Sequence, residues 1–233
     1  MTRARAARDP DAWDQGCATD RVRNEVVIPH LEGVLCSSRA QSVLDLGSGT
    51  GYITLALARA PWAAGISWTL VDIDEQLLRY ALASMSPSYT IATLAHDLAG
   101  TTAPGDTRGD VAFVVFTTLE LQITQQLAIN LRGMLNPGGK LLIYLPDVLA
   151  DIYAASEPRE ALAAFLTGHA VLEKVDHFTE TRESFHATRA EKLISVLLAE
   201  HLTLTNLEIL PRSDREENIY CLAFQRAPSM PSG

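Results

Sequence analysis

Three closely spaced glycines follow a short apolar run, and this is the pattern in the sequence best suited to binding chemistry. The apolar run, residues 42–46, reads as a buried strand, and Gly47, Gly49 and Gly51 come directly after it. Glycines there let the backbone approach a ligand closely, and the next helix brings its free N–H groups to the same place. Asp45, two residues before Gly47, would repel a pyrophosphate and suits a ligand that carries an ammonium group.

The spacing of this loop disfavours two other nucleotide sites. A phosphate-binding P-loop needs a lysine directly after its last glycine, and here Tyr52 follows Gly51. The dinucleotide fingerprint G-x-G-x-x-G needs its third glycine one place later, where Tyr52 stands. An NAD-dependent oxidoreductase is therefore a distant alternative.

Three acidic residues follow other apolar runs. Asp72 comes after residues 66–71, Asp97 shortly after residues 89–95, and Glu120 shortly after residues 110–116.

The elements that must position these residues alternate between strands and helices. Near-continuous apolar strands between amphipathic helices imply a parallel sheet covered on both faces. The expected strands are residues 42–46, 66–71, 89–95, 110–116 and 140–145, and the expected helices are 53–60, 74–85, 119–135, 157–167 and 191–201. Residues 204–210 and 219–224 read as an antiparallel hairpin that closes the sheet.

The flanking segments suggest how the chain is divided. Residues 1–20 are polar and expected to be frayed or loosely packed. Residues 21–38 have the spacing of an amphipathic helix that is kinked or restarts at Pro29. We expect residues 1–38 to form an N-terminal helical cap on a core of residues 39–233. Within that core, the irregular insert at about 147–190 is a candidate substrate cap.

Taken in order, these motifs resemble class I S-adenosylmethionine (SAM)-dependent methyltransferases. Residues 45–51, Asp-Leu-Gly-Ser-Gly-Thr-Gly, are similar to the SAM-binding signature of that family. Residues 71–74 and 95–98 are similar to the ends of its second and third strands, and the resemblance covers roughly residues 40–145. It implies a Rossmann-like, doubly wound, mostly parallel seven-stranded sheet with a C-terminal antiparallel hairpin and helices on both faces.

The resemblance also implies roles for single residues. Asp72 would hold the ribose hydroxyls, Ile73 would pack on the adenine and Asp97 would bind the adenine amino group. Glu120 would orient or deprotonate the substrate, unless it is only a favourable acid in the first turn of a helix. By analogy, Trp13, Arg23 and His30 would help to close the site. The other residues implied to bind the cofactor are Asp45, Gly47, Ser48, Gly49, Gly51, Leu98, Phe116 and Thr117.

Composition narrows the class of partner. The chain has 233 residues and a formal net charge of −9, which disfavours a nucleic-acid substrate. Its three cysteines form no C-x-x-C pair and no convincing metal spacing occurs, so neither a zinc site nor a disulfide framework is expected. The sequence has no apolar run of about 18 residues, so we expect no membrane span and a cytoplasmic protein.

The expected function is transfer of the SAM methyl group to an N, O or C atom of a small molecule, with S-adenosylhomocysteine (SAH) as product. A specialised metabolite is one candidate acceptor. Two alternatives stay open. In the first, the enzyme transfers the aminocarboxypropyl arm of SAM or cyclises that arm, and either reaction gives methylthioadenosine. In the second, the chain is a SAM-binding regulatory pseudoenzyme. The sequence leaves the acceptor atom and the oligomeric state open.

Overall fold

A seven-stranded sheet forms the centre of the protein. The computed structural model describes residues 9–116, 123–146, 162, 171–175, 182–186, 190–210 and 219–228. The strand order is β3-β2-β1-β4-β5-β9-β8, with β1 to β5 parallel and β9 antiparallel to both of its neighbours. This order confirms the predicted parallel sheet and its closing hairpin. The strands are β1 (Ser42–Leu46), β2 (Ser67–Asp72), β3 (Thr90–Ala95), β4 (Gly109–Val115), β5 (Leu135–Pro146), β8 (Leu202–Leu210) and β9 (Ile219–Arg226).

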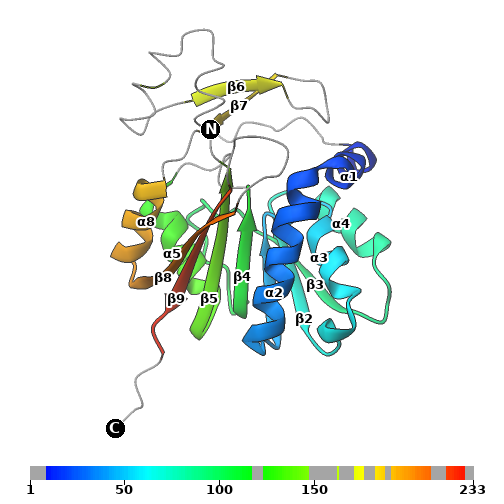
Figure 1. Ribbon diagram of the computed structural model, residues 1–233, viewed down its shortest axis with the longest axis horizontal. Coiled ribbons are helices and arrows are strands. Elements are labelled where there is room, and N and C mark those ends of the chain that lie inside the picture. The colour runs from blue at the N-terminus through cyan, green and yellow to red at the C-terminus, as the bar shows by residue number, and fades with distance from the viewer. Residues whose placement is uncertain are drawn as a thin grey trace.

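Helices cover both faces of this sheet (Figure 1). One face packs α5 and α8 against Leu44 and Leu46 of β1, and the other packs α2 and α3 against Val43 and Phe113. Residues of β1 therefore alternate between two cores, as a strand buried on both faces requires. The helices are α1 (Pro10–Thr19), the π-helix η1 (Val22–Val27), α2 (Ile28–Ser38), α3 (Tyr52–Ala58), the 3-10 helix η2 (Pro61–Ala63), α4 (Glu75–Ser84), α5 (Gln125–Gly133) and α8 (Ala190–Ala199).

Side-chain caps fix where two of these helices begin. Asp74 accepts from the backbone N–H groups of Gln76 and Leu77 at 2.9 and 3.3 Å and so starts α4, as predicted. Thr124 accepts from the N–H of Leu127 at 3.2 Å and starts α5. The predicted start of this second helix, at residue 119, lies outside the described residues. Within them the helix begins only at Gln125, because the extended Thr124 is its N-cap.

The N-terminal segment was also predicted wrongly. Residues 10–19 form helix α1 instead of a frayed end. Asp9 caps it by accepting from the N–H of Asp11 at 3.0 Å, and Pro10 occupies its first turn, where a proline costs no hydrogen bond.

Two further expectations need correction. Strand β5 begins at Leu135, five places before the predicted start, and its pairing with β4 shifts register between Gly109 and Val111. The insert that was expected to be irregular contains a two-stranded antiparallel sheet, β6 (Val171–Val175) with β7 (Arg182–His186). The predicted helix at 157–167 lies outside the described residues, apart from residue 162. Within the described ranges, no helix is both long and apolar enough to cross a bilayer.

Candidate functional site

The glycine loop is held in one conformation at the carboxyl end of β1. Gly47, Gly49 and Gly51 have φ values of 77°, 55° and 73°, a region that residues with a Cβ rarely adopt. The N–H groups of Gly47 and Ser48 both donate to the carbonyl of Val71 at the end of β2, at 2.7 and 3.0 Å. The loop therefore needs its glycines, and it is fastened to the neighbouring strand.

Gly51 is also crowded, which gives a stability prediction. A Cβ there would lie 3.0 Å from Leu70 Cδ1 and 3.3 Å from Ala81 Cβ, whereas Gly105, with a similar φ of 68°, has no described atom within 4 Å of such a Cβ. We expect Gly105→Ala to lower the free energy of unfolding by about 1–2 kcal/mol through backbone strain alone. Gly51→Ala should cost about 1–3 kcal/mol more, because overpacking adds to the strain. Urea unfolding checks this, and equal costs for the two variants would show that the crowding is relieved without penalty.

Asp72 links the glycine loop to the helix that follows β2. Its Oδ2 accepts from the N–H of Gly49 at 2.8 Å, and its Oδ1 accepts from the N–H of Asp74 at 3.0 Å. A carboxylate offers about four lone-pair positions. Two of them are used here, so the same group can still accept hydrogen bonds from a ligand.

Asp45 lies beneath this loop and is buried, with 4% of its surface exposed. Thr54 of α3 donates its Oγ1 hydrogen to Asp45 Oδ2 at 2.7 Å. Burial raises the pKa of Asp45 to about 7, the nearby charge of Asp72 adds to that rise, and the hydrogen bond from Thr54 and the charge of Arg23 oppose it. A cation placed beside this carboxyl group would favour its charged form.

Helix α1 covers the glycine loop. Thr50 donates its Oγ1 hydrogen to Asp14 Oδ1 at 2.5 Å, and a Cβ at Gly49 would lie 3.1 Å from the indole nitrogen of Trp13. Tyr80 of α4 donates its hydroxyl hydrogen to Asp11 Oδ1 at 2.8 Å. In Figure 1, α1 lies at the end of the molecule toward which β4 and β5 point.

The end of β3 brings a second set of polar groups to this edge. The N–H of His96 donates to the carbonyl of Asp72 at 2.9 Å, and Asp97 Oδ1 accepts from the N–H of Ala99 at 2.9 Å. Ser48 Oγ and His96 Nε2 are buried and have no hydrogen-bond partner among the described residues. Burial lowers the pKa of His96, which favours the neutral ring. Buried polar atoms normally have partners, so these two atoms are suited to contact a ligand.

The two apolar residues predicted to contact the cofactor, Ile73 and Leu98, lie in different environments. Ile73 has 52% of its surface exposed beside Asp72, as an apolar residue that covers a flat ligand would. The side chain of Leu98 is buried in the core against α5, and its carbonyl accepts from Asn130 Nδ2 at 2.9 Å.

Phe116 follows the last residue of β4 and has a φ of 59°, which is uncommon for an aromatic residue. Its N–H donates to the carbonyl of Tyr144 at 3.2 Å, and the Cζ of Arg23 lies 5.5 Å from the centre of its ring. Strained residues of this kind cluster at functional sites. Thr117 and Glu120, predicted to follow in the same site, lie outside the described residues.

The structure thus brings most of the predicted residues to one edge of the sheet, and it adds two that the sequence analysis missed. Asp14 contacts the loop from α1, and His96 is joined to Asp72. The pair Asp9-Pro10, a capping residue before a proline, was a signal for α1 that could have been recognised. Among the described residues, no group of His, Cys, Asp and Glu side chains could hold a metal ion.

Comparison with known proteins places this geometry among related folds. Residues 43–139 match the methyltransferase domain family. A protein of Pyrococcus horikoshii OT3 has a similar fold, with a TM-score of 0.66 and 19% identity over 88% of this chain and 90% of that one. No curated protein sequence is significantly similar.

Two further similar folds come from proteins whose structures contain SAH. The N-methyltransferase NodS of Bradyrhizobium japonicum WM9 gives a TM-score of 0.58 and 18% identity, with 89% of this chain and 87% of that one covered. The glycopeptide N-methyltransferase MtfA gives a TM-score of 0.62 and 13% identity, with 86% of this chain and 88% of that one covered. At these identities the likeness establishes the fold.

Proposed function

Since residues 43–139 are a class I, SAM-dependent methyltransferase domain, we propose that this protein transfers the methyl group of SAM to an N, O or C atom of a small molecule. The observation that carries the proposal is the glycine loop, which lies between the buried carboxyl group of Asp45 and the carboxylate of Asp72. SAH would be the product.

The residues present fit SAM at this edge. Asp72 has lone pairs left for ribose hydroxyls, and the exposed Ile73 offers an apolar surface for adenine. Asp97 would bind the adenine amino group. The carboxyl group of Asp45 beneath the loop suits the ammonium group at the amino-acid end of SAM. When bound, SAM supplies an electrophilic methyl group on a positively charged sulfur.

The protein itself would position SAM and the acceptor and exclude water from them. Helix α1 lies over the glycine loop, and Asp14 holds it there through Thr50. Holding two reactants in line lowers the activation free energy by about 7–11 kcal/mol in well-oriented systems. A general base is needed only for an acceptor that must lose a proton, and Glu120 is the candidate for that role.

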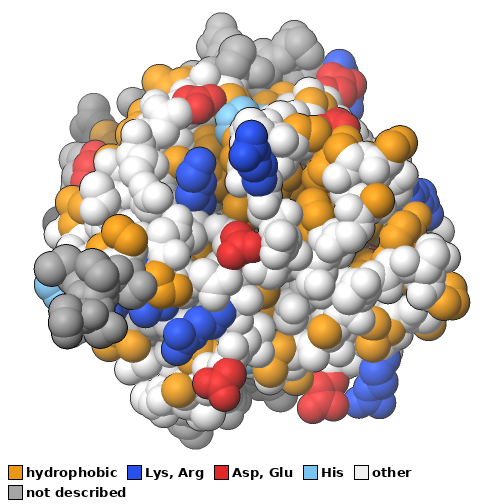
Figure 2. All heavy atoms as spheres, turned by 90° about the horizontal axis from the view of Figure 1, so that it is seen from below, with side chains coloured by type: hydrophobic (Ala, Val, Ile, Leu, Met, Phe, Trp, Pro, Cys, Tyr) orange, Lys and Arg blue, Asp and Glu red, His pale blue; other side chains and the backbone are white. Residues whose placement is uncertain are grey.

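A small-molecule acceptor is supported by charge. The chain has a net charge of −9, and a nucleic acid would be repelled by such an excess. In Figure 2, the Lys and Arg side chains on the face opposite the site are scattered among acidic and apolar ones and form no single basic surface. We further propose that residues 1–38 form a helical cap over the SAM site and that the insert at about 147–190 caps the substrate.

Product analysis tests the proposal. The protein is incubated with SAM and pooled small-molecule acceptors, and the nucleoside products are identified by mass spectrometry. We expect SAH together with an acceptor that is heavier by one methylene unit. Methylthioadenosine as the nucleoside product would instead support transfer or cyclisation of the aminocarboxypropyl arm and would overturn methyl transfer.

A further inference from the structure

Asn130 of α5 is a buried polar side chain that the proposed mechanism does not use. Only 1% of its surface is exposed. Its Nδ2 donates to the carbonyl of Leu98 at 2.9 Å and to that of Gly100 at 2.8 Å, and its Oδ1 accepts from Gln126 Nε2 at 3.0 Å. Both amide hydrogens are therefore used. A flipped amide would turn its oxygen toward the two carbonyls, so this side chain has one favourable orientation.

The two carbonyls belong to residues 97–100, the turn that follows β3. Within this turn the N–H of Gly100 donates to the carbonyl of Asp97 at 3.0 Å, and the N–H of Ala99 donates to Asp97 Oδ1 at 2.9 Å. A Cβ at Gly100 would lie 3.1 Å from both the Cβ and the carbonyl oxygen of Asp97, which is closer than side chains normally pack. The turn therefore closes tightly over Asp97, and Asn130 fastens it to α5.

This turn leaves part of the Asp97 carboxylate unused. Its Oδ1 accepts from Ala99, whereas its Oδ2 accepts no hydrogen bond among the described residues. The preceding residue, His96, has a buried Nε2 that also lacks a partner within the described part of the chain. Unused polar atoms of this kind are suited to meet a ligand. The conformation of the turn therefore decides which acceptor is presented to that ligand.

We propose that Asn130 is a positioning residue for recognition of the adenine amino group, an inference that rests on the proposed function. By fixing the carbonyls of Leu98 and Gly100, it holds the turn in which Asp97 Oδ1 is engaged and Oδ2 is left for the amino group. Without this amide the two carbonyls lose their donor, and the turn rearranges to find other partners. The preference for an amino-substituted purine is then lost, while the other contacts to the ligand remain.

The test compares SAH with S-inosylhomocysteine, in which an oxo group replaces the amino group of adenine. In calorimetric titrations the wild-type protein should bind SAH about 10- to 100-fold more tightly, because a carboxylate accepts from an amino group and repels an oxo group. Asn130→Leu removes both donors at similar volume and should lower this preference by about tenfold or more. Asp97→Asn should reverse the preference, since its amide nitrogen would take the place of Oδ2.

Two further variants separate positioning from stability. Gly100→Ala crowds the same turn without removing a buried amide, so it should also lower the preference, and it decides the test if Asn130→Leu does not fold. Gln125→Leu is the matched control, because Gln125 Nε2 of the same helix donates to Glu200 Oε1 at 2.8 Å in a contact that does not involve the turn. This control should lose stability and keep the preference of the wild type.

The ratio of the two affinities decides the inference. A preference that is lost in Asn130→Leu and Gly100→Ala but kept in Gln125→Leu supports it. The inference is overturned if the folded variants keep the preference, which includes a loss of affinity that is equal for both ligands, as a purely structural role would give. A wild-type protein that binds both ligands equally would also overturn it. Failure of SAH to bind the wild-type protein at all would instead overturn the proposed function.

Discussion

Replacing Asp72 with alanine should weaken the binding of SAH by about 100-fold or more. Its carboxylate accepts from the N–H groups of Gly49 and Asp74 at 2.8 and 3.0 Å, and the proposed function adds the ribose hydroxyls. Each hydrogen bond to a charged group contributes about 1.5–3 kcal/mol, and about 1.4 kcal/mol corresponds to a factor of ten in affinity. Calorimetric titration of the folded variant with SAH measures the loss.

Two variants control for other effects at the same place. Asp74→Ala removes the N-cap of α4 and should lower the free energy of unfolding by about 1 kcal/mol with little change in affinity. Asp72→Asn should give an intermediate loss, because the amide keeps one acceptor. Methylthioadenosine has the same ribose as SAH, so Asp72→Ala should weaken both ligands. A folded Asp72→Ala protein that binds SAH as tightly as wild type would disprove the ribose assignment.

The affinity for SAH should fall as the pH is lowered through about 7. The pKa of Asp45 is raised to about 7 in the free protein, mainly by burial, and an ammonium group beside it would lower that pKa in the complex. Binding below pH 7 therefore requires the loss of one proton, which costs up to about tenfold in affinity per pH unit. Titrations at pH 8, 7 and 6 measure the slope, and Asp45→Asn should bind weakly with no such slope.

The stability of the ligand-free protein should change with pH in the opposite sense. The pKa of Asp45 in the folded protein lies above its ordinary value of 3.8, so folding favours the protonated side chain. The contribution of Asp45 to the free energy of unfolding is therefore fully present below about pH 4 and is lost as the pH rises through about 7. Stabilisation by SAH should accordingly be larger at pH 8 than at pH 6. An affinity that is the same from pH 8 to pH 6 would show that the ammonium group does not lie beside Asp45.

Much of this fold follows from local patterns in the sequence. Apolar runs marked each parallel strand, and Asp74 marked the start of α4, because a strand core and a helix cap depend on neighbouring residues. The glycine loop was predictable for the same reason. Its three positive φ values need glycine, and glycine is visible in the sequence.

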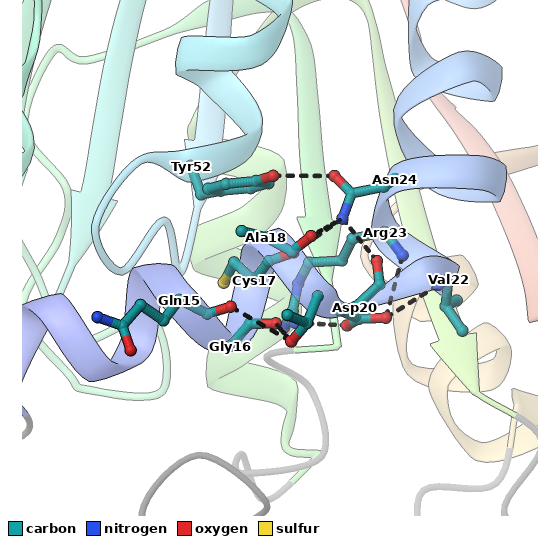
Figure 3. A network of polar contacts seen from close by, with 10 residues as sticks. Gln15, Gly16, Cys17, Ala18, Asp20, Val22, Arg23, Asn24 and Tyr52 are labelled. Atoms are coloured by element: carbon teal, nitrogen blue, oxygen red, sulfur yellow. Dashed lines mark hydrogen bonds and ion pairs between the residues drawn. The ribbon is translucent and has the colours of Figure 1, made fainter.

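The remaining features depend on contacts between distant residues. Asp72 holds Gly49 across 23 positions, and Tyr80 holds Asp11 across 69, so neither the double role of Asp72 nor the placement of α1 could be read from a local pattern. Asn24, in the π-helix η1, likewise accepts the hydroxyl hydrogen of Tyr52 across 28 positions (Figure 3). The acceptor is harder still to predict, because methyl transfer requires no residue of a particular type.

Thermal unfolding with and without SAH tests the central claim most directly, with NAD as the control ligand. SAH at about 100 times its dissociation constant should raise the free energy of unfolding by about 2.7 kcal/mol, and NAD should have no effect. An upward shift of the unfolding temperature with SAH alone is the predicted result. No shift with SAH, or an equal shift with NAD, would contradict the assignment of this edge of the sheet to SAM.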